Sequence, residues 1–267
     1  MLKDITLGQY FPGDSVVHKL DPRTKLIMVV LYIVALFLAN GFVGYGVMIA
    51  VTAWFIGMSK VPPKSMFRGL KSVILIIVLT AVLNIFYTDG TVLVQVWKLK
   101  ITYEGIVRAV FMVLRIVMLI CGTFLLTYTT APVALTDGME MLMNPLKKLK
   151  VPVHEMSMMM SMALRFIPTL IEETDKIMSA QKARGADFET GSLMDRAKAL
   201  LPILVPLFIS AFRRADELAI AMESRCYNGG AGRTRMKQLR YAGRDYLALT
   251  FGVLLIVGMV GLQVIGL

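Results

Sequence analysis

LIMVVLYIVALFLANGFVGYGVMIAVTAWFIGMS, residues 26–59, contains no charged residue and decides the fold class. A membrane-spanning helix needs about 20 apolar residues, so this run is too long for one upright helix. Asn40 and Gly41 lie near its middle, and residues of these types interrupt helices. The stretch therefore predicts two short membrane helices, about 24–40 and 43–58, joined by an uncharged turn.

The composition of the whole chain fits a membrane protein with a sizeable aqueous part. Of the 267 residues, 57% are hydrophobic and 18% are charged, and the mean hydropathy is +0.68. A soluble domain carries about 25% charged residues. The formal charge is +11. Because membrane proteins concentrate Lys and Arg on their cytoplasmic side, the membrane explains this charge and no nucleic-acid partner is expected.

Three further apolar stretches have the length of a membrane span: 72–88, about 106–128 and 246–267. Basic residues gather in segments 60–71 and 131–245, and positively charged loops face the cytoplasm. The sequence thus predicts an all-α polytopic membrane protein with about five transmembrane helices, a cytoplasmic N-terminus and an extracellular C-terminus. Asp21 is the expected N-cap of the first helix, and Pro22 suits its first position.

Segment 131–245 is expected to form a cytoplasmic helical region. It follows the spans of residues 1–130 and precedes the last span at 246–267. It carries 17 Lys and Arg and 13 Asp and Glu, more than half of the chain's residues of each sign. Because Pro and Gly punctuate it at wide intervals, three helices are predicted, at about 133–148, 154–184 and 192–226.

Two apolar stretches within this region are too short to span a membrane. One is rich in methionine: Met156, Met158, Met159, Met160 and Met162. The other, residues 199–212, is uncharged. Methionine is unbranched and repacks easily, so the first stretch is either an adaptable core or a surface that accepts a moving partner. The sequence leaves both alternatives open.

Two arginines stand at the ends of the predicted long helices. Arg184 precedes Gly185, which is a candidate left-handed cap, and Arg225 precedes a glycine-rich segment. Helix C-termini favour cations, so helix capping alone is enough to explain both arginines. A guanidinium also offers a planar fork of donors that suits carboxylates and carbonyls on a partner.

Arg115 lies inside the fourth predicted span. A lone arginine in a membrane is costly and often functional. The alternative is that its long side chain extends from a tilted helix to the membrane surface. The sequence supports the two explanations equally.

The sequence offers no site for chemistry. Cys121 and Cys226 occupy an apolar run and a basic loop, which excludes a disulfide framework and a paired-cysteine metal site. His18 and His154 lie far apart, with no ligand cluster around either. The chain contains no GxxxxGK[ST] phosphate loop. We therefore expect no catalytic residue, no metal and no cofactor, and we do not expect an enzyme.

Three motifs together resemble one family. PGDSVVHKLDPRTKL (12–26), LRFIPTLIEETDKIMSAQKARG (164–185) and AMESRCYNGGAGRTR (221–235) are similar to the opening and the two coupling helices of the T component of energy-coupling factor (ECF) transporters, which are ABC-type importers of vitamins and trace nutrients. The resemblance runs nearly end to end. The chain departs from the pattern at its second Ala-Arg-Gly position, where Ser224, Arg225 and Cys226 stand.

The resemblance implies a coupling subunit in a bacterial-type cell membrane. Such a subunit ties two cytoplasmic ATPase subunits, which hydrolyse ATP, to a small substrate-binding membrane protein, the S component. Its long helices form an X-shaped platform whose arginines dock in the ATPases. The implied ATPase-coupling residues are Ala183, Arg184, Gly185, Ser224, Arg225 and Cys226. For the S component we expect an interface that includes Met156, Met159, Met160, Leu204, Leu207 and Phe208, unless these residues pack within the chain.

Other transporter classes fit the sequence less well. A secondary transporter is expected to show intramembrane ion-coupling residues or repeated halves, and this chain shows only Arg115 and no obvious repeat. The permease subunit of another ABC-type importer remains the alternative, although its Glu-Ala-Ala coupling-loop signature is absent. The nutrient itself is not encoded here, because specificity in ECF transporters resides in the S component.

Overall fold

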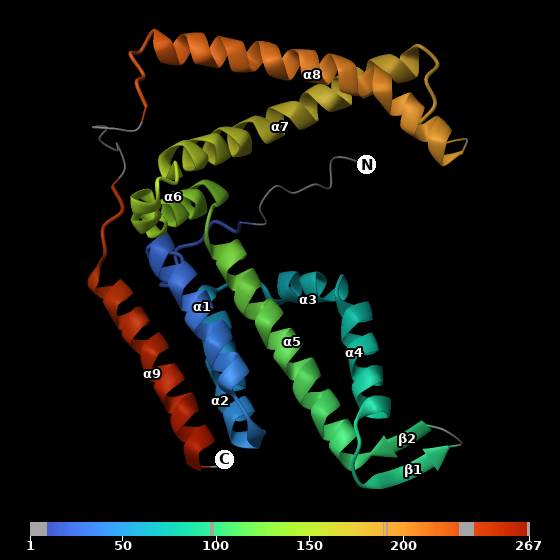
Figure 1. Cartoon of the computed structure of the whole chain (residues 1–267), viewed down its shortest axis with the longest axis vertical. Coiled ribbons are helices and arrows are strands. Elements are labelled where there is room, and N and C mark those ends of the chain that lie inside the picture. Colours follow the sequence, from blue (N-terminus) through green and yellow to red (C-terminus); the bar gives the residue numbers. More distant parts are fainter. Residues whose placement is uncertain (1–9, 97–98, 189, 191, 230–237, 266–267) are drawn as a thin grey trace. The chain divides into compact units, whose positions relative to one another are not determined.

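The structure is a computed structural model that describes residues 10–96, 99–188, 190, 192–229 and 238–265 (Figure 1). The chain divides into two compact units. Unit 1 comprises Met1–Leu7 and Met143–Gln238, and unit 2 comprises Gly8–Leu142 and Leu239–Leu267. The described residues are mainly helical, which confirms the all-α expectation.

Four helices of unit 2 run side by side: α1 (Pro22–Leu38), α2 (Gly41–Ser59), α5 (Tyr103–Thr129) and α9 (Gly243–Ile265) (Figure 1). α1 packs between α9 and α5, and α5 also contacts α2. Their shared core is apolar and includes Leu36, Met48, Met118 and Met259. Tyr32 lies in the same core, where its hydroxyl shares a hydrogen bond of 2.7 Å with that of Thr52.

Local sequence explains where the first two helices begin and end. The Asp21 carboxylate accepts the amide of Arg23, and Pro22 is the first helical residue, as predicted. Gly41 begins α2 with a φ of +67°, a conformation that favours glycine. The predicted break at Asn40-Gly41 is therefore confirmed.

The segment after α2 differs from the expected loop. Residues 63–71 form a helix, α3 (Pro63–Lys71), which is bent by 64° against α4 (Ile74–Tyr87). Met66 and Leu70 pack into a small cluster with Tyr128 of α5. The expectation that 60–71 is only a connecting loop is wrong, because this apolar pair gives the basic segment a face that packs on α5.

A short antiparallel hairpin connects α4 to α5. Strand β1 (Val92–Val96) pairs with β2 (Leu99–Thr102) (Figure 1). The amide and hydroxyl of Thr91 donate to the carboxylate of Glu104, at 2.7 and 2.9 Å. The hairpin is thereby fastened to the first turn of α5.

Among the described residues, three helices are long and apolar enough to cross a membrane: α2, α5 and α9. The bent pair α3 and α4 passes the same test when taken together. α1 has 17 residues, which corresponds to about 26 Å at 1.5 Å per residue. A bilayer core of about 30 Å is only slightly thicker, so the count of five spans stays a prediction.

The helix predicted at 133–148 is interrupted. α6 (Pro132–Leu142) belongs to unit 2, and a 3-10 helix, η2 (Asn144–Leu149), follows it in unit 1. Proline disfavours the α conformation for the residue before it, and Pro145 follows Asn144. The single predicted helix is therefore wrong at this point.

The two long helices of unit 1 are α7 (Val153–Ala183) and α8 (Leu193–Glu223), close to the predicted 154–184 and 192–226. α8 begins with a capping box, in which Ser192 and Asp195 satisfy each other's backbone amides. The two helices pack against one another and cross (Figure 1). At one contact the Gln181 side-chain amide donates to the Pro202 carbonyl at 3.4 Å.

Candidate functional site

α7 ends in a left-handed glycine cap that presents Arg184. Gly185 has a φ of +88°, which suits glycine. The amide of Ala186 donates to the carbonyl of Gln181, and that of Gly185 donates to Lys182, both at 3.0 Å. These two bonds define a Schellman motif. The predicted cap at Gly185 is confirmed, and Arg184 is the last residue before the chain turns.

α8 ends in the same motif without a glycine. Cys226 has a φ of +57°. The amide of Tyr227 donates to the carbonyl of Met222 at 3.1 Å, and that of Cys226 donates to Glu223 at 2.8 Å. Arg225 is therefore the last residue before the turn, as Arg184 is in α7.

The two helix ends correspond position by position. Each has a small residue, then arginine, then a left-handed residue: Ala183, Arg184 and Gly185 in α7, and Ser224, Arg225 and Cys226 in α8. Ser-Arg-Cys thus forms the same backbone turn in α8 as Ala-Arg-Gly does in α7. The shared requirement is a left-handed turn directly after the arginine. The remainder of the third motif, residues 230–235, lies outside the described residues.

Because Cys226 is in the left-handed conformation, we expect exchanges between cysteine and glycine to have opposite effects on the stability of the two helix ends. A side chain in this region costs about 1–2 kcal/mol, so we expect Cys226→Gly to strengthen the end of α8. Gly185→Cys should weaken the end of α7. Hydrogen exchange of the amides of residues 226–227 and 185–186 measures both changes. Equal protection before and after each substitution would contradict the shared motif.

The side chains of Arg184 and Arg225 are exposed, and within the part of the chain that the structure describes neither guanidinium contacts a hydrogen-bonding or ionic partner. They lie at opposite ends of the crossed pair. Gln181, near Arg184, contacts Pro202 in the first half of α8. Met222, near Arg225, instead faces Met158 in the first turns of α7. The arrangement offers two separate, equivalent cationic tips.

A groove of about 370 Å³ lies between α7 and α8. Its lining is mostly apolar: Met158, Met159, Met162, Phe166 and Leu170 from α7, and Ala211, Arg214, Ala215, Leu218, Ala219 and Met222 from α8. The Ala residues recur every fourth position, which leaves room along one face of α8. Arg214 is the charged residue of the lining, and its Nη2 lies 3.2 Å from Oε2 of Glu173.

The sequence-predicted S-component residues fall in two places. Met159 lines the groove, and Met156 and Met160 are exposed nearby on α7. Leu204 and Phe208 are exposed and Leu207 is half-buried in the first half of α8, toward the crossing at Pro202. The structure thus shows two accessible apolar patches on α7 and α8.

Arg115 contacts the turn between α1 and α2. Its Nη2 donates to the carbonyl of Ala39, the C-cap of α1, at 3.3 Å. Its guanidinium lies 5.5 and 5.6 Å from the ring centres of Phe37 and Tyr45. A cation at a helix C-terminus and beside aromatic rings is stabilising. Within unit 2, Arg115 therefore ties α5 to the end of α1.

Among the residues that the structure describes, no group of three or more His, Cys, Asp or Glu side chains could hold a metal ion. Unit 1 presents two cationic helix ends and the apolar surfaces of α7 and α8. These features suit binding to other proteins.

Comparison with known proteins identifies the family. The model of the cobalt transport protein family CbiQ matches residues 13–237. The energy-coupling factor transporter transmembrane protein EcfT of Clostridium kluyveri is 56% identical over 258 residues, which cover 96% of each chain. EcfT of Bacillus subtilis is 50% identical over 246 residues, covering 92% of this chain and 93% of the relative. EcfT of Lactococcus lactis is 45% identical over 247 residues, with the same coverage.

The matched residues include all three motifs described above, apart from one residue at the start of the first. Family membership agrees with the apolar helices of unit 2 and with the long paired helices of unit 1. The chain therefore belongs to the CbiQ family and is a T component, the transmembrane protein of an energy-coupling factor transporter.

Proposed function

We propose that this T component ties two cytoplasmic ATPase subunits to a substrate-binding S component in an importer of vitamins or other micronutrients. The observation that carries the proposal is the pair of equivalent helix ends bearing Arg184 and Arg225 at opposite ends of the crossed helices. An exposed guanidinium fork suits carboxylates and carbonyls on a partner. Two such tips suit two ATPase subunits, which would supply ATP hydrolysis.

The S component is proposed to bind the apolar surfaces of α7 and α8. Met156, Met159 and Met160 provide a surface that repacks at little cost, while Leu204, Leu207 and Phe208 provide a second patch. Exposed apolar patches of this kind mark sites for protein or membrane contact. One helix pair would then contact the ATPases through its tips and the S component through its sides, which suits a subunit that transmits movement.

Reconstitution tests this function. The complex is purified through a tag on this chain and placed in liposomes, and radiolabelled riboflavin, folate, biotin and thiamine are offered in turn. We expect uptake of at least one vitamin with ATP and no uptake with a non-hydrolysable analogue. Uptake by this chain alone, without ATPases, would contradict the proposal and favour a secondary transporter.

We also propose the orientation in the bacterial cell membrane: a cytoplasmic N-terminus, five spans, residues 131–245 in the cytoplasm and an extracellular C-terminus. The basic segments 60–71 and 131–245 motivate it. In a chain without its two native cysteines, a cysteine at position 236 should resist an impermeant maleimide applied to intact cells. A cysteine added after Leu267 should react. The reverse pattern would contradict the orientation.

A further inference from the structure

A carboxylate joins the starts of α1 and α9 in unit 2. Asp245 is 2% exposed. Its Oδ1 accepts the amide of Asp21 at 2.8 Å, and its Oδ2 accepts the amide of Ala242 at 2.8 Å. One buried side chain thus ties together two helix starts that are 224 positions apart in the sequence.

Asp21 holds a second set of contacts at the same place. Its carboxylate accepts Nε and Nη2 of Arg23, at 3.0 and 2.9 Å. Burial acts to raise the pKa of Asp21, but the hydrogen bonds and charge of Arg23 hold that pKa below its ordinary value. The Arg23 guanidinium lies 4.0 Å from the ring centre of Tyr241. The segment that leads into α9 is therefore held by both Asp245 and Arg23.

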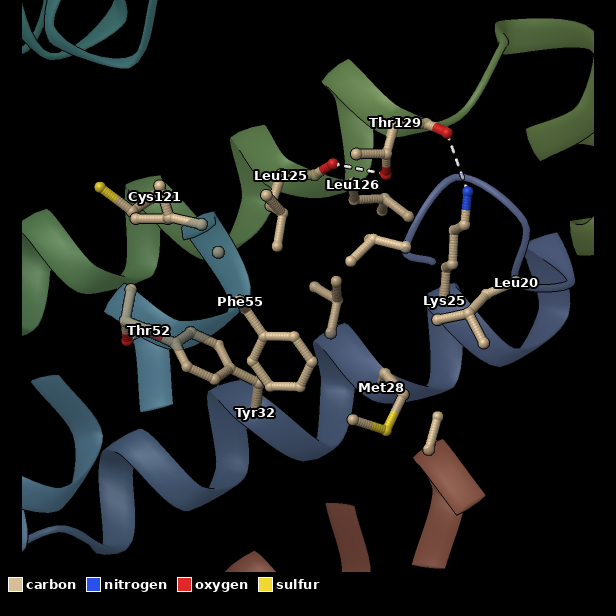
Figure 2. A pocket seen from close by; sticks show the side chains of 15 residues that line it. Leu20, Lys25, Met28, Tyr32, Thr52, Phe55, Cys121, Leu125, Leu126 and Thr129 are labelled. Carbon is tan, nitrogen blue, oxygen red and sulfur yellow. Dashed lines mark hydrogen bonds between the residues drawn. The ribbon is translucent and has the colours of Figure 1, made fainter. Parts of the chain in front are cut away.

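Lys25 joins α1 to the end of α5. Figure 2 shows its side chain reaching toward Thr129, whose carbonyl accepts Nζ at 2.8 Å. Nζ also donates to the Thr130 hydroxyl at 3.2 Å and to the carbonyl of His18 at 3.1 Å. All three donors of the buried ammonium are used. The turn from α5 to α6 and the N-terminal segment are thereby fixed to the start of α1.

These contacts fix segments of unit 2 that lead toward the three points where the chain passes between the units. The passages are at residues 7/8, 142/143 and 238/239. Lys25 binds the carbonyl of His18, which lies in the N-terminal segment that follows the first passage. α6 leads to the second passage and packs closely against the start of α1. A Cβ added at Gly138 of α6 would lie 3.0 Å from Cβ of Pro22. Arg23 and Asp245 hold the segment after the third.

We propose that Asp21, Arg23, Lys25 and Asp245, here called the clasp, are positioning residues for energy coupling. The clasp fixes, at the start of α1, the unit-2 segments that lead to the connections with unit 1, so a movement of unit 1 is delivered to the helix bundle as a whole. Charge-assisted hydrogen bonds in a buried setting are strong, and the two carboxylates balance the two cations. Without the clasp, the connecting segments would bend and absorb the movement.

The proposal rests on the proposed function, and it is tested in the same liposomes with the vitamin that the wild-type complex takes up. The readout is the number of vitamin molecules imported per ATP hydrolysed. Asp245→Asn keeps the size of the side chain but leaves the amide of either Asp21 or Ala242 without its acceptor. We expect the complex to assemble and hydrolyse ATP while the ratio falls by about tenfold or more. Asp14→Asn is the matched control, because its carboxylate is 99% exposed.

A merely structural role predicts a different result. It would lower the amount of complex, the ATP hydrolysis and the uptake together, with an unchanged ratio, and that outcome would overturn the proposal. If Asp245→Asn does not assemble, Tyr241→Leu decides, since it removes a ring that is 39% exposed and contacts Arg23 and Tyr246. We expect a fall in the ratio of about threefold, and an unchanged ratio overturns the clasp. Uptake by the wild-type chain without ATPases would overturn the proposed function and the clasp with it.

Discussion

Replacing both Arg184 and Arg225 by alanine is expected to abolish vitamin uptake and to release the ATPase subunits. Both side chains are exposed at equivalent helix ends, so neither change disturbs the fold of unit 1. Loss of a charge-assisted contact that is desolvated at an interface costs about 2–5 kcal/mol. One such loss weakens assembly, and two remove it. Uptake into liposomes and pull-down of the ATPases through a tag on this chain measure the effect.

Two control variants separate position from charge. Arg165→Ala with Arg213→Ala removes the same charge from exposed positions within the helices and should leave the complex intact. Lysine at 184 and 225 should rescue poorly, because an ammonium cannot form the same planar fork. Full uptake by an intact complex carrying alanine at both tips would refute the role of these arginines.

Replacing Met159 and Met160 by aspartate is expected to release the S component while the ATPases stay bound. The two side chains are 59% and 50% exposed, so the substitution buries no charge in the isolated chain. At an apolar interface the two carboxylates would be desolvated without partners, which is strongly unfavourable. Quantitative mass spectrometry of the purified complex gives the ratio of S component to ATPase.

The control for this pair is Met194→Asp, which places a carboxylate at another exposed methionine of unit 1. It should leave the S component bound. The competing explanation is that the methionines pack only within this chain. Reduced amounts of the isolated double variant, or unchanged retention of the S component, would support that explanation and contradict the interface.

Much of the fold follows from local sequence. The charge-free run at residues 26–59 and the cap at Asp21 predict α1 and α2 to within a few residues. α3 was missed because Lys64, Arg68 and Lys71 dominate its composition. Its packing residues, Met66 and Leu70, are four apart and lie on one helix face. That spacing is the signal that identifies the helix.

The candidate site also has a part that local sequence predicts and a part that it does not. Gly185 predicts a left-handed cap because glycine favours that conformation, whereas nothing local marks Cys226 for the same role. The partners of Asp245 could not be predicted either, because Asp21 lies 224 positions away. The two patches around Met159 and Phe208 lie on different helices, and their separation depends on how α7 and α8 cross.

Purification of the tagged chain from native membranes in mild detergent tests the central claim most directly. Mass spectrometry of the eluate identifies and counts its partners. If the chain is the coupling subunit of an ECF importer, two ATPase subunits and a small membrane-embedded substrate-binding protein elute with it. Recovery of the chain alone, in a form that transports a solute without any ATPase, would contradict the claim.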